Sequence, residues 1–432
     1  MFEDLTLDDL VIRSSSHTSF FGVYLATHAI DDGLCMCHAS VGCKVKTQHH
    51  LVGHDGMRDA HVRMRYSQFI DEDLIQGSTA QLEEEIKAWS ERQHPGVVVI
   101  DASTPISLQG QGMAGVIQRM EAATGADVVF VDARNYDADL YAGYSRTLGT
   151  LLERQRWAAR KVRPDEVSII GHVFDRYEPD QIANVAELRR LLGALGLAAP
   201  AVFLAGEPYA KLASVVHARS HIVLPYAHSE VRTLHKLGQT TVATGMPLGL
   251  AGTKAWLRAV GREVDASARA EAVIEHEAAR LKPLYELARR QLERKRFAVF
   301  ADAPRAAGTI ATLREVGMVP ACIGVLHKSP GGAAEVRRWL YEWHGMELPA
   351  DVRWLEDPTP AAVAALDLAD CDVALGTTIE REALARAGKP WVEMGFPSEL
   401  RHFLFPAPTL GFQGALRLLE QVMAALERAV GR

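Results

Sequence analysis

The sequence predicts an α/β protein with three doubly wound domains, each with a small, mainly parallel sheet covered by helices. Two observations predict this class. Short apolar runs rich in Val and Ile alternate with longer segments of helical period along most of the chain. These runs are continuous rather than alternating, which is typical of strands buried on both faces of a parallel sheet. The 432 residues also exceed what one hydrophobic core can fill.

The predicted elements follow one another regularly after the N-terminal segment. The strands are the apolar runs at 96–101, 126–132, 167–171, 221–225, 297–301, 319–325 and 371–376. The helices are amphipathic segments such as 79–92, 185–195 and 275–294. Polar connections at 160–164 and 289–296 interrupt this alternation of strands and helices. We therefore place domains at 1–160, 161–290 and 291–432, and the first of them carries the main candidate site.

Charge and hydropathy exclude several classes of function. The net charge is -7, and no long Lys/Arg run occurs that would neutralise a phosphate backbone, so nucleic acid is not an expected partner. The N-terminus, residues 1–9, is acidic and lacks the basic and apolar regions of a signal peptide. No apolar stretch is long enough to span a membrane. We expect a cytoplasmic protein that does not bind membranes.

The main candidate site is the segment His38–Cys43. It places one thiol, Cys43, directly after a small turn that ends the apolar run Tyr24–Met36. A thiolate in this position can be presented to a soft metal centre at a surface shared with a partner. The alternative is that Cys43 is a small buried hydrophobe, which is the common role of a lone cysteine.

The cysteines indicate no disulfide framework, because five in so long a chain are too few. Cys35 and Cys37 are separated by one residue in a strand-like run, so both side chains are expected on one face. We interpret them as core residues, with a metal or redox role as the alternative. Cys322 and Cys371 are interpreted as strand thiols in a core.

Ligands of open α/β sheets gather beyond the carboxyl ends of the strands. Four loops fit that position: 101–107, 171–172, 301–305 and 376–378. Ser and Thr at 103–104 and 377–378 either bind a ligand or cap the following helix. None of these four loops contains GxGxxG or GxxxxGK[ST], so any nucleotide is expected on another chain. No GxSxG motif is present, and catalytic residues stay unassigned.

Two further patterns leave alternatives open. On a helix, His50 and His54 would share one face, with His49 beside them. They are either zinc ligands or part of a solvated histidine cluster, and the sequence does not identify the third ligand that zinc would require. The glycine-punctuated loop Gly245–Thr253 could approach a cofactor closely, or could be a tight loop between a strand and its helix.

Taken in order, several motifs resemble the nitrogenase superfamily. The resemblance is to β-type subunits of nitrogenase-like reductases, including the chlorophyllide reductase Z-type and protochlorophyllide reductase subunits, and to nitrogenase β and cofactor-scaffold N-type subunits. The segments that carry it are Phe20–Ile30, His38–Cys43, Asp73–Ser78, Asp101–Gly110, Gly245–Trp256, Leu281–Leu287, Gly395–Pro397 and Pro408–Gly414. They span nearly the whole chain.

The resemblance implies an iron-sulfur centre with Cys43 as its metal ligand. Nitrogenase β chains bring three cysteines to an eight-iron cluster, but here the upstream position falls around His17 and the downstream one around Thr104. Only Cys43 remains, as in members whose α-type partner supplies three cysteines to a 4Fe-4S cluster at the interface. Gly42 and Ser40 would lie beside that cluster. An eight-iron cluster resembling the P-cluster is the alternative.

The implied function is that of an oxidoreductase subunit active only in a complex. An iron-sulfur ATPase would dock on an α2β2 heterotetramer, and electrons would pass through the shared cluster to a substrate site that lies mostly on the homologous α-type subunit. The alternative is a scaffold subunit on which a nitrogenase-type iron-sulfur cofactor is assembled. A periplasmic sugar- or metal-binding protein is a third class, against which the absence of an export signal argues. The sequence does not identify the substrate.

Overall fold

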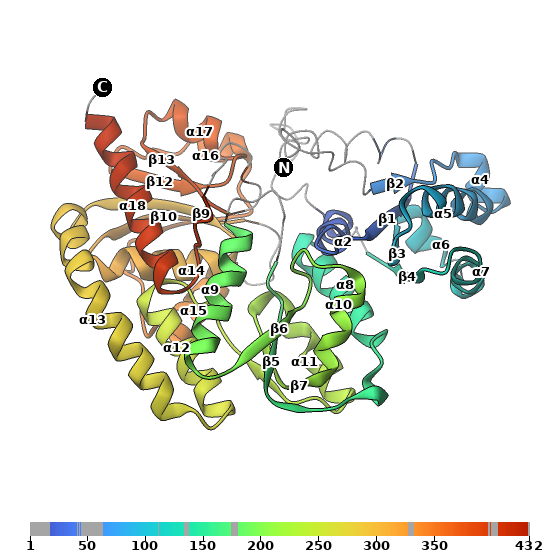
Figure 1. Cartoon of the computed structure of the whole chain (residues 1–432). Coiled ribbons are helices and arrows are strands. Elements are labelled where there is room, and N and C mark those ends of the chain that lie inside the picture. The colour runs from blue at the N-terminus through green and yellow to red at the C-terminus, as the bar shows by residue number, and fades with distance from the viewer. Residues whose placement is uncertain are drawn as a thin grey trace. The chain divides into compact units, whose positions relative to one another are not determined.

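The computed structural model describes residues 18–40, 42, 44, 64–110, 112–133, 138–173, 180–326, 332–395, 398 and 405–430. These residues form three sheets with helices packed on them (Figure 1). The predicted α/β class with small parallel sheets covered by helices is confirmed. None of the helices in the described part of the chain is long and apolar enough to cross a membrane.

The N-terminal sheet has the strand order β2-β1-β3-β4 and is parallel throughout. Its strands are β1 (Gly33–His38), β2 (Met64–Tyr66), β3 (Val97–Ala102) and β4 (Asp127–Val131). All residues of β1 and β3 are buried, which explains why both strands are continuous apolar runs.

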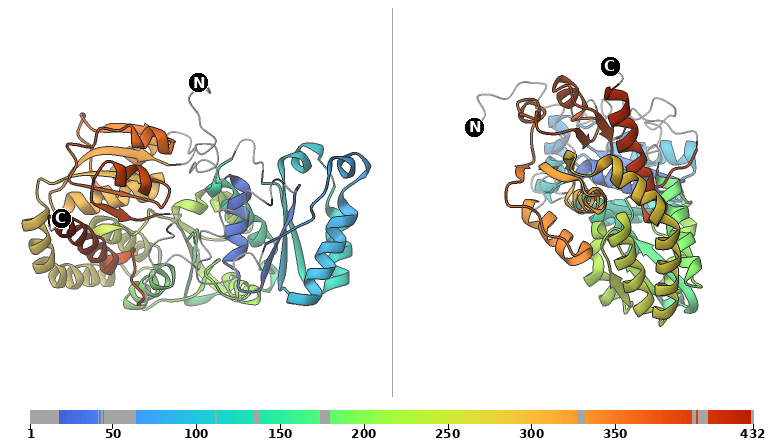
Figure 2. Two further views of the ribbon diagram at one scale, coloured as in Figure 1. Left: turned by 90° about the horizontal axis from the view of Figure 1, so that it is seen from above. Right: turned by 90° about the vertical axis from the view of Figure 1, so that its left-hand side faces the viewer.

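Helices cover both faces of this sheet. On one face Leu34 and Met36 join a core with residues of α5 (Thr79–Gln93) and α7 (Ala114–Thr124). On the other face α2 (Ser19–His28) packs on β1 and β3, and α8 (Leu140–Glu153) packs on β4. Figure 2 (left) shows the dark blue α2 on one side of these strands and the cyan helices on the other.

The contact between α2 and α8 depends on two glycines. A Cβ atom on Gly22 would lie 1.9 Å from the carbonyl oxygen of Leu140, and one on Gly143 would lie 1.9 Å from that of Ser19. The helix backbones therefore approach so closely that no side chain fits between them. Every residue of α2 is buried, so this helix is enclosed on all sides and is not amphipathic.

The second sheet has the order β6-β5-β7-β8. Its strands are β5 (Arg163–Ile170), β6 (Ala198–Val202), β7 (Ala218–Val223) and β8 (Thr241–Ala243). The third sheet has the order β11-β10-β9-β12-β13 and is parallel. Its strands are β9 (Arg296–Ala301), β10 (Val319–Val325), β11 (Arg353–Glu356), β12 (Val373–Gly376) and β13 (Trp391–Glu393).

The remaining helices lie between these strands along the chain. The longer ones are α9 (Gln181–Ala194), α12 (Gly249–Glu263), α13 (Ser267–Leu292), α14 (Ala303–Glu315), α15 (Gly332–His344) and α18 (Gly411–Val430). The short ones are α4 (Asp71–Gln76), α6 (Thr104–Gln109), α10 (Tyr209–Leu212), α11 (Val231–Lys236), α16 (Pro360–Ala364) and α17 (Arg381–Arg386), with the short 3₁₀ helices η3 (Trp157–Ala159), η4 (Ala213–His217) and η5 (Pro225–Glu230).

Contacts divide the described residues into two compact units. The first holds those of His17–Tyr177 and Ala199–Thr241, and the second those of Glu178–Ala198 and Val242–Arg432. Helix α9 belongs to the second unit because Asn184 Oδ1 accepts the N–H groups of Thr409 and Leu410 just before α18, at 2.8 and 2.9 Å. One sheet lies within each of the three predicted domain ranges, but the domain division itself stays a prediction.

Candidate functional site

The predicted site residues follow the carboxyl end of β1. Ser40 is half-buried and forms a parallel bridge to Phe69, so the chain leaves β1 still paired with its neighbour. Gly42 is exposed, and a Cβ on it would have as its nearest described neighbour Ser40 Oγ at 4.0 Å. Cys43, the predicted ligand, lies outside the described residues. The structure thus describes the two residues beside it and the strand that leads to it.

His38, the last residue of β1, joins the neighbouring segments at this edge. Its Nδ1 lies 2.8 Å from Ser67 Oγ, and its Nε2 lies 2.9 Å from Ser78 Oγ. The Phe69 ring packs against the imidazole in an edge-to-face arrangement, with ring centroids 5.3 Å apart. Burial lowers the pKa of His38 to about 4, so the ring is neutral at physiological pH. His38 therefore fixes the carboxyl end of β1 without contributing charge.

Cys35 and Cys37 lie on the opposite face of β1 from His38. The prediction that they share one face and are buried is confirmed, since their sulfur atoms are 3.9 Å apart and both residues are fully buried. Asp101, which pairs with Cys37 across β1 and β3, brings a third donor to the same place. The two sulfurs and a carboxylate oxygen all lie within 4.8 Å of one another. This donor set can hold a metal ion.

The sequence did not reveal the grouping of Asp101 with the two thiols. Asp101 and Cys37 are each the penultimate residue of their strand, and the in-register pairing of β1 with β3 brings them together. A sequence pattern predicts each strand, but it does not predict the register between two strands that residues 39–96 separate. The available signal was a carboxylate inside an apolar strand, because such a group is costly to bury.

Beyond β3, Ser103 and Thr104 begin helix α6. Ser103 occupies the N-cap position, but its hydroxyl makes no capping hydrogen bond. Ser103 is 2% exposed, and its Oγ has no hydrogen-bond partner among the described residues. The sequence left open whether Ser103 caps the helix or binds a ligand, and its side chain does not cap α6. A buried hydroxyl remains at the carboxyl edge of the sheet.

The other predicted strand-end residues have structural partners. Thr377 donates its hydroxyl to Glu380 at 2.6 Å, and Thr378 donates to Glu393 at 2.5 Å. Burial raises the pKa of Glu380 to about 7, and hydrogen bonds from Thr377 act in the opposite direction. Thr377 and Thr378 therefore stabilise the loop after β12. His49, His50 and His54 lie outside the described residues.

Cys322 and Cys371 are buried in the core of the third sheet, as predicted. Cys322 lies within β10, whereas Cys371 lies just before β12 rather than inside a strand. Burial raises the pKa of each thiol to about 11. Both sulfurs are therefore protonated and behave as core atoms.

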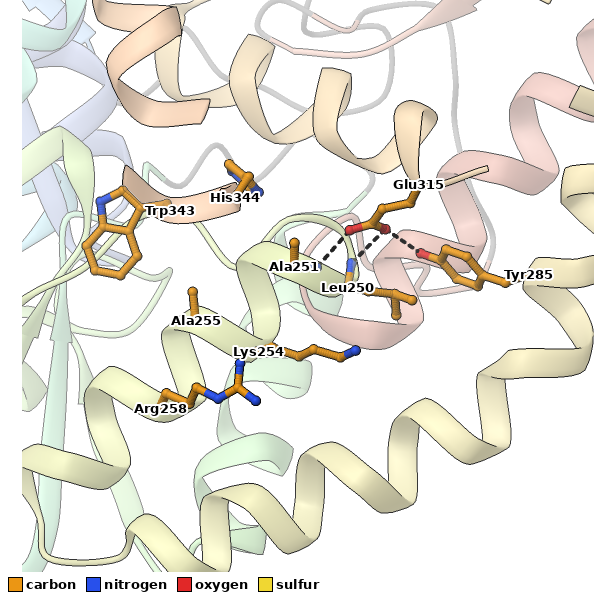
Figure 3. Close-up of a pocket in the computed structure, with 9 residues that line it drawn as sticks. All are labelled: Leu250, Ala251, Lys254, Ala255, Arg258, Tyr285, Glu315, Trp343 and His344. Atoms are coloured by element: carbon orange, nitrogen blue, oxygen red, sulfur yellow. Dashed lines mark hydrogen bonds between the residues drawn. The ribbon is translucent and has the colours of Figure 1, made fainter. Parts of the chain in front are cut away.

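A pocket of about 480 Å³ in the second unit lies against the first turns of α12 (Figure 3). Glu315 enters it from the end of α14 and accepts the N–H groups of Leu250 and Ala251 at 3.0 and 2.7 Å. Tyr285 also donates its hydroxyl to Glu315, at 3.1 Å. Burial raises the pKa of Glu315, while these hydrogen bonds lower it. The carboxylate thus occupies the helix N-terminus that an anionic ligand would otherwise bind.

The glycine-rich loop before α12 packs closely against the protein itself. A Cβ on Gly245 would lie 2.6 Å from the indole of Trp343, and one on Gly252 would lie 2.6 Å from His344. Gly249 has φ +69°, which a side chain would strain. These contacts favour the tight-loop alternative for Gly245–Thr253, and the sequence missed Glu315 as the residue that holds this helix end.

Comparisons with known proteins place the chain in a family. The family model of nitrogenase component 1 type oxidoreductases matches residues 18–427. The chain belongs to this family. The resemblance inferred from the motifs is thereby confirmed, and the family members it matches are oxidoreductase subunits of nitrogenase-like complexes.

The relatives in this family are distant in sequence. The B-type subunit of light-independent protochlorophyllide reductase from Heliobacterium modesticaldum is 24% identical to this chain. The aligned part covers 81% of this chain and 66% of that relative. The nitrogenase molybdenum-iron protein beta chain of Methanothermobacter thermautotrophicus is 21% identical over 96% of this chain and 94% of its own length. A solved structure of nitrogenase Cp1 at pH 6.5 superposes with a TM-score of 0.80 over 95% of this chain and 92% of that one, at 18% identity. That structure supports the nitrogenase component 1 fold.

Proposed function

We propose that this chain is the β-type subunit of a nitrogenase-like, ATP-dependent reductase. It relays electrons from an iron-sulfur ATPase, through an iron-sulfur cluster shared with an α-type partner, to a substrate site in the complex. The observation that carries the proposal is the family match over nearly the whole chain, combined with one cysteine, Cys43, in the segment that follows the carboxyl end of the inner strand β1. That end of a parallel sheet is where open α/β proteins bind ligands.

Cys43 supplies the cluster ligand from this chain, and the 4Fe-4S type fits a single thiolate completed by a partner. The cluster, when bound, accepts and passes on single electrons. The residues beside Cys43 fit such a group. Gly42 is exposed and carries no side chain that would hinder it, and the pairing of Ser40 with Phe69 fixes the start of the turn. The buried Ser103 hydroxyl is a hydrogen-bond donor at the same edge of the sheet.

The remaining components belong to other chains. The sequence carries no GxxxxGK[ST] motif, so the ATPase is a separate protein that docks on the complex. The complex is an α2β2 heterotetramer in the cytoplasm, and most of the substrate pocket lies on the α-type subunit.

The test is the Cys43→Ala variant, purified anaerobically together with the α-type partner. We expect the variant to assemble with its partner but to lose the cluster's electron paramagnetic resonance signal and all ATP-dependent reduction, because alanine offers no ligand atom. Cys322→Ala is the matched control, since it removes a buried thiol from the third sheet. Full turnover by Cys43→Ala with unchanged iron content would falsify the role of Cys43.

The alternative role as a cofactor-assembly scaffold rests on the closing segments Gly395–Pro397 and Pro408–Gly414. The purified complex, incubated with its ATPase and candidate substrates, separates the two roles. A reductase forms product over many turnovers, whereas a scaffold releases an iron-sulfur cofactor once and forms no product.

A further inference from the structure

Three buried donor atoms meet between the N-terminal sheet and α2. Cys35 and Cys37 alternate along β1, so their side chains point to the same face, and Asp101 on β3 is the direct neighbour of Cys37. Their ligand atoms lie within 4.8 Å of one another. Leu34 and Met36 point to the other face, into the core with α5 and α7, so the group lies on the face that α2 covers.

We propose that Cys35, Cys37 and Asp101 form a binding site for one thiophilic divalent cation, of which zinc is the representative. Two thiolates and one carboxylate are a donor set that zinc accepts, whereas magnesium and calcium require oxygen ligands alone. In the described part of the chain no further His, Cys, Asp or Glu joins the group. The three residues therefore leave one position of a tetrahedral ion for water or another ligand.

The distance between the two sulfurs fits a single ion. With zinc-sulfur bonds of about 2.3 Å and tetrahedral angles, two thiolates on one ion lie about 3.8 Å apart. The measured separation of Cys35 Sγ and Cys37 Sγ is 3.9 Å. Thiolates that bind different irons of a cubane cluster have the cluster between them, so a pair this close is suited to one metal ion rather than to such a cluster.

A bound cation would balance the negative charge of these buried ligands. All three residues are 0% exposed, and a cation bound beside a buried carboxylate lowers the electrostatic cost of keeping that charge away from water. Binding replaces the two thiol protons by the cation, so each zinc ion that enters releases two protons to solvent and leaves two thiolates and the carboxylate around a double positive charge. No electron is transferred in this step.

The third sheet contains a natural comparison. Cys322 and Cys371 are also buried thiols, and Asp370 is the acidic residue beside them, whose charge raises the pKa of both. The Asp370 side chain, however, is 49% exposed and pairs with Arg296 and Arg353. This second set of thiols lacks a buried carboxylate donor and is expected not to bind zinc.

The test uses the full-length chain, purified anaerobically with its partner and freed of zinc by a chelator. Zinc and cobalt(II) are each titrated against a competing chelator. We expect about one zinc ion per chain, an affinity that rises with pH as two protons are released, and thiolate-to-cobalt charge-transfer absorption. X-ray absorption at the zinc edge of the unmutated protein should show two sulfur neighbours, and this measurement needs no variant. An edge spectrum without sulfur neighbours, or no zinc retained against the chelator, overturns the proposal.

Variants assign the ligands. The double variant Cys35→Ser/Cys37→Ser should lose the charge-transfer band and at least tenfold in zinc affinity, and Asp101→Asn should weaken zinc binding while keeping the band. The control, Cys322→Ser/Cys371→Ser, removes as many buried thiols and should bind zinc as the unmutated chain does. Equal zinc binding by the Cys35→Ser/Cys37→Ser variant contradicts the site.

Iron and zinc analyses separate this site from the proposed cluster. Cys43→Ala should lose iron and keep zinc. Cys35→Ser/Cys37→Ser should lose zinc and keep the iron signal of the complex. If Cys43→Ala lost both metals, the zinc would depend on the cluster ligand, and the three-residue site would be refuted.

Discussion

At the scale of single residues, the face of the strand decides the role of each side chain. In Leu34–His38 the side chains alternate between a helix-covered apolar core and the face under α2. Met36 thus becomes a core residue, while its neighbours Cys35 and Cys37 meet Asp101. A shift of one residue in the pairing with β3 would exchange these roles.

The buried imidazole of His38 makes stability depend on pH. Its pKa is lowered to about 4 in the fold against 6.5 for the free side chain, so between these values the unfolded chain binds a proton that the folded chain does not. The contribution of His38 to the free energy of unfolding is therefore fully present above pH 6.5. It is lost as the pH falls toward 4, and the loss amounts to at most about 3 kcal/mol. We expect the urea midpoint of the protein to fall in that window.

The variant that isolates this effect is His38→Gln. It removes the titrating ring but retains an amide that can bond the hydroxyls of Ser67 and Ser78. The slope of the free energy of unfolding against pH between 6.5 and 4 should decrease by the equivalent of about one proton taken up on unfolding. Other buried histidines such as His221 continue to contribute to that slope. An unchanged slope would show that His38 titrates normally in the folded protein.

At the scale of elements, most strands and helices could be predicted because their hydrophobic pattern is long enough to read. The run 319–325 is β10 without change of bounds, and the segment 79–92 is α5 to within one residue. The sequence missed β2, β6, β8, β11 and β13, which have three to five residues each. Such short strands owe their conformation to the neighbour they pair with, and single-sequence patterns do not carry that information.

The candidate site was predictable only in part, for the same reason. The position of Ser40 and Gly42 after β1 follows from the strand itself, whereas the meeting of Asp101 with Cys37 follows from strand register. Likewise, Glu315 caps α12 from another helix, 65 residues from Leu250 along the chain. Patterns within one segment cannot reveal a contact of that kind.

The close packing of α2 on α8 predicts a strong effect of one methyl group. Gly143→Ala would place Cβ against the backbone carbonyl of Ser19, and because backbone cannot move aside as a flexible side chain can, we expect a loss of about 1–3 kcal/mol or more. The control is Gly193→Ala, whose Cβ meets nothing within 4 Å in the exposed part of α9. That change should stabilise by about 0.5–1 kcal/mol. Chemical denaturation measures both, and equal effects would refute the close contact.

At the scale of the whole molecule, the chain has more than one hydrophobic core. The core that contains Leu34 and Met36 belongs to the first compact unit, and the core that contains Phe300 and Cys322 belongs to the second. Helix α9 precedes β6 in sequence but is held in the second unit by Asn184, so the chain passes between the units more than once. Units with their own cores can unfold in separate steps.

Calorimetry can test whether the two units unfold in separate steps, because one destabilising variant is available for each unit. We expect two overlapping thermal transitions. Gly143→Ala should lower only the transition of the first unit, since α2 and α8 lie there. Glu315→Ala removes the acceptor for the N–H groups of Leu250 and Ala251 and for the Tyr285 hydroxyl, which should cost about 1–3 kcal/mol and lower only the other transition.

The size of the expected shifts makes the outcome decisive. A loss of about 1 kcal/mol lowers the melting temperature of a unit of 150–250 residues by roughly 2–4 °C, which calorimetry resolves easily. Because the two substitutions act in different units, the double variant should show both shifts without interaction, as expected for distant sites. If either single variant lowered both transitions equally, or if one transition accounted for the whole heat of unfolding, the two cores would unfold as one cooperative structure.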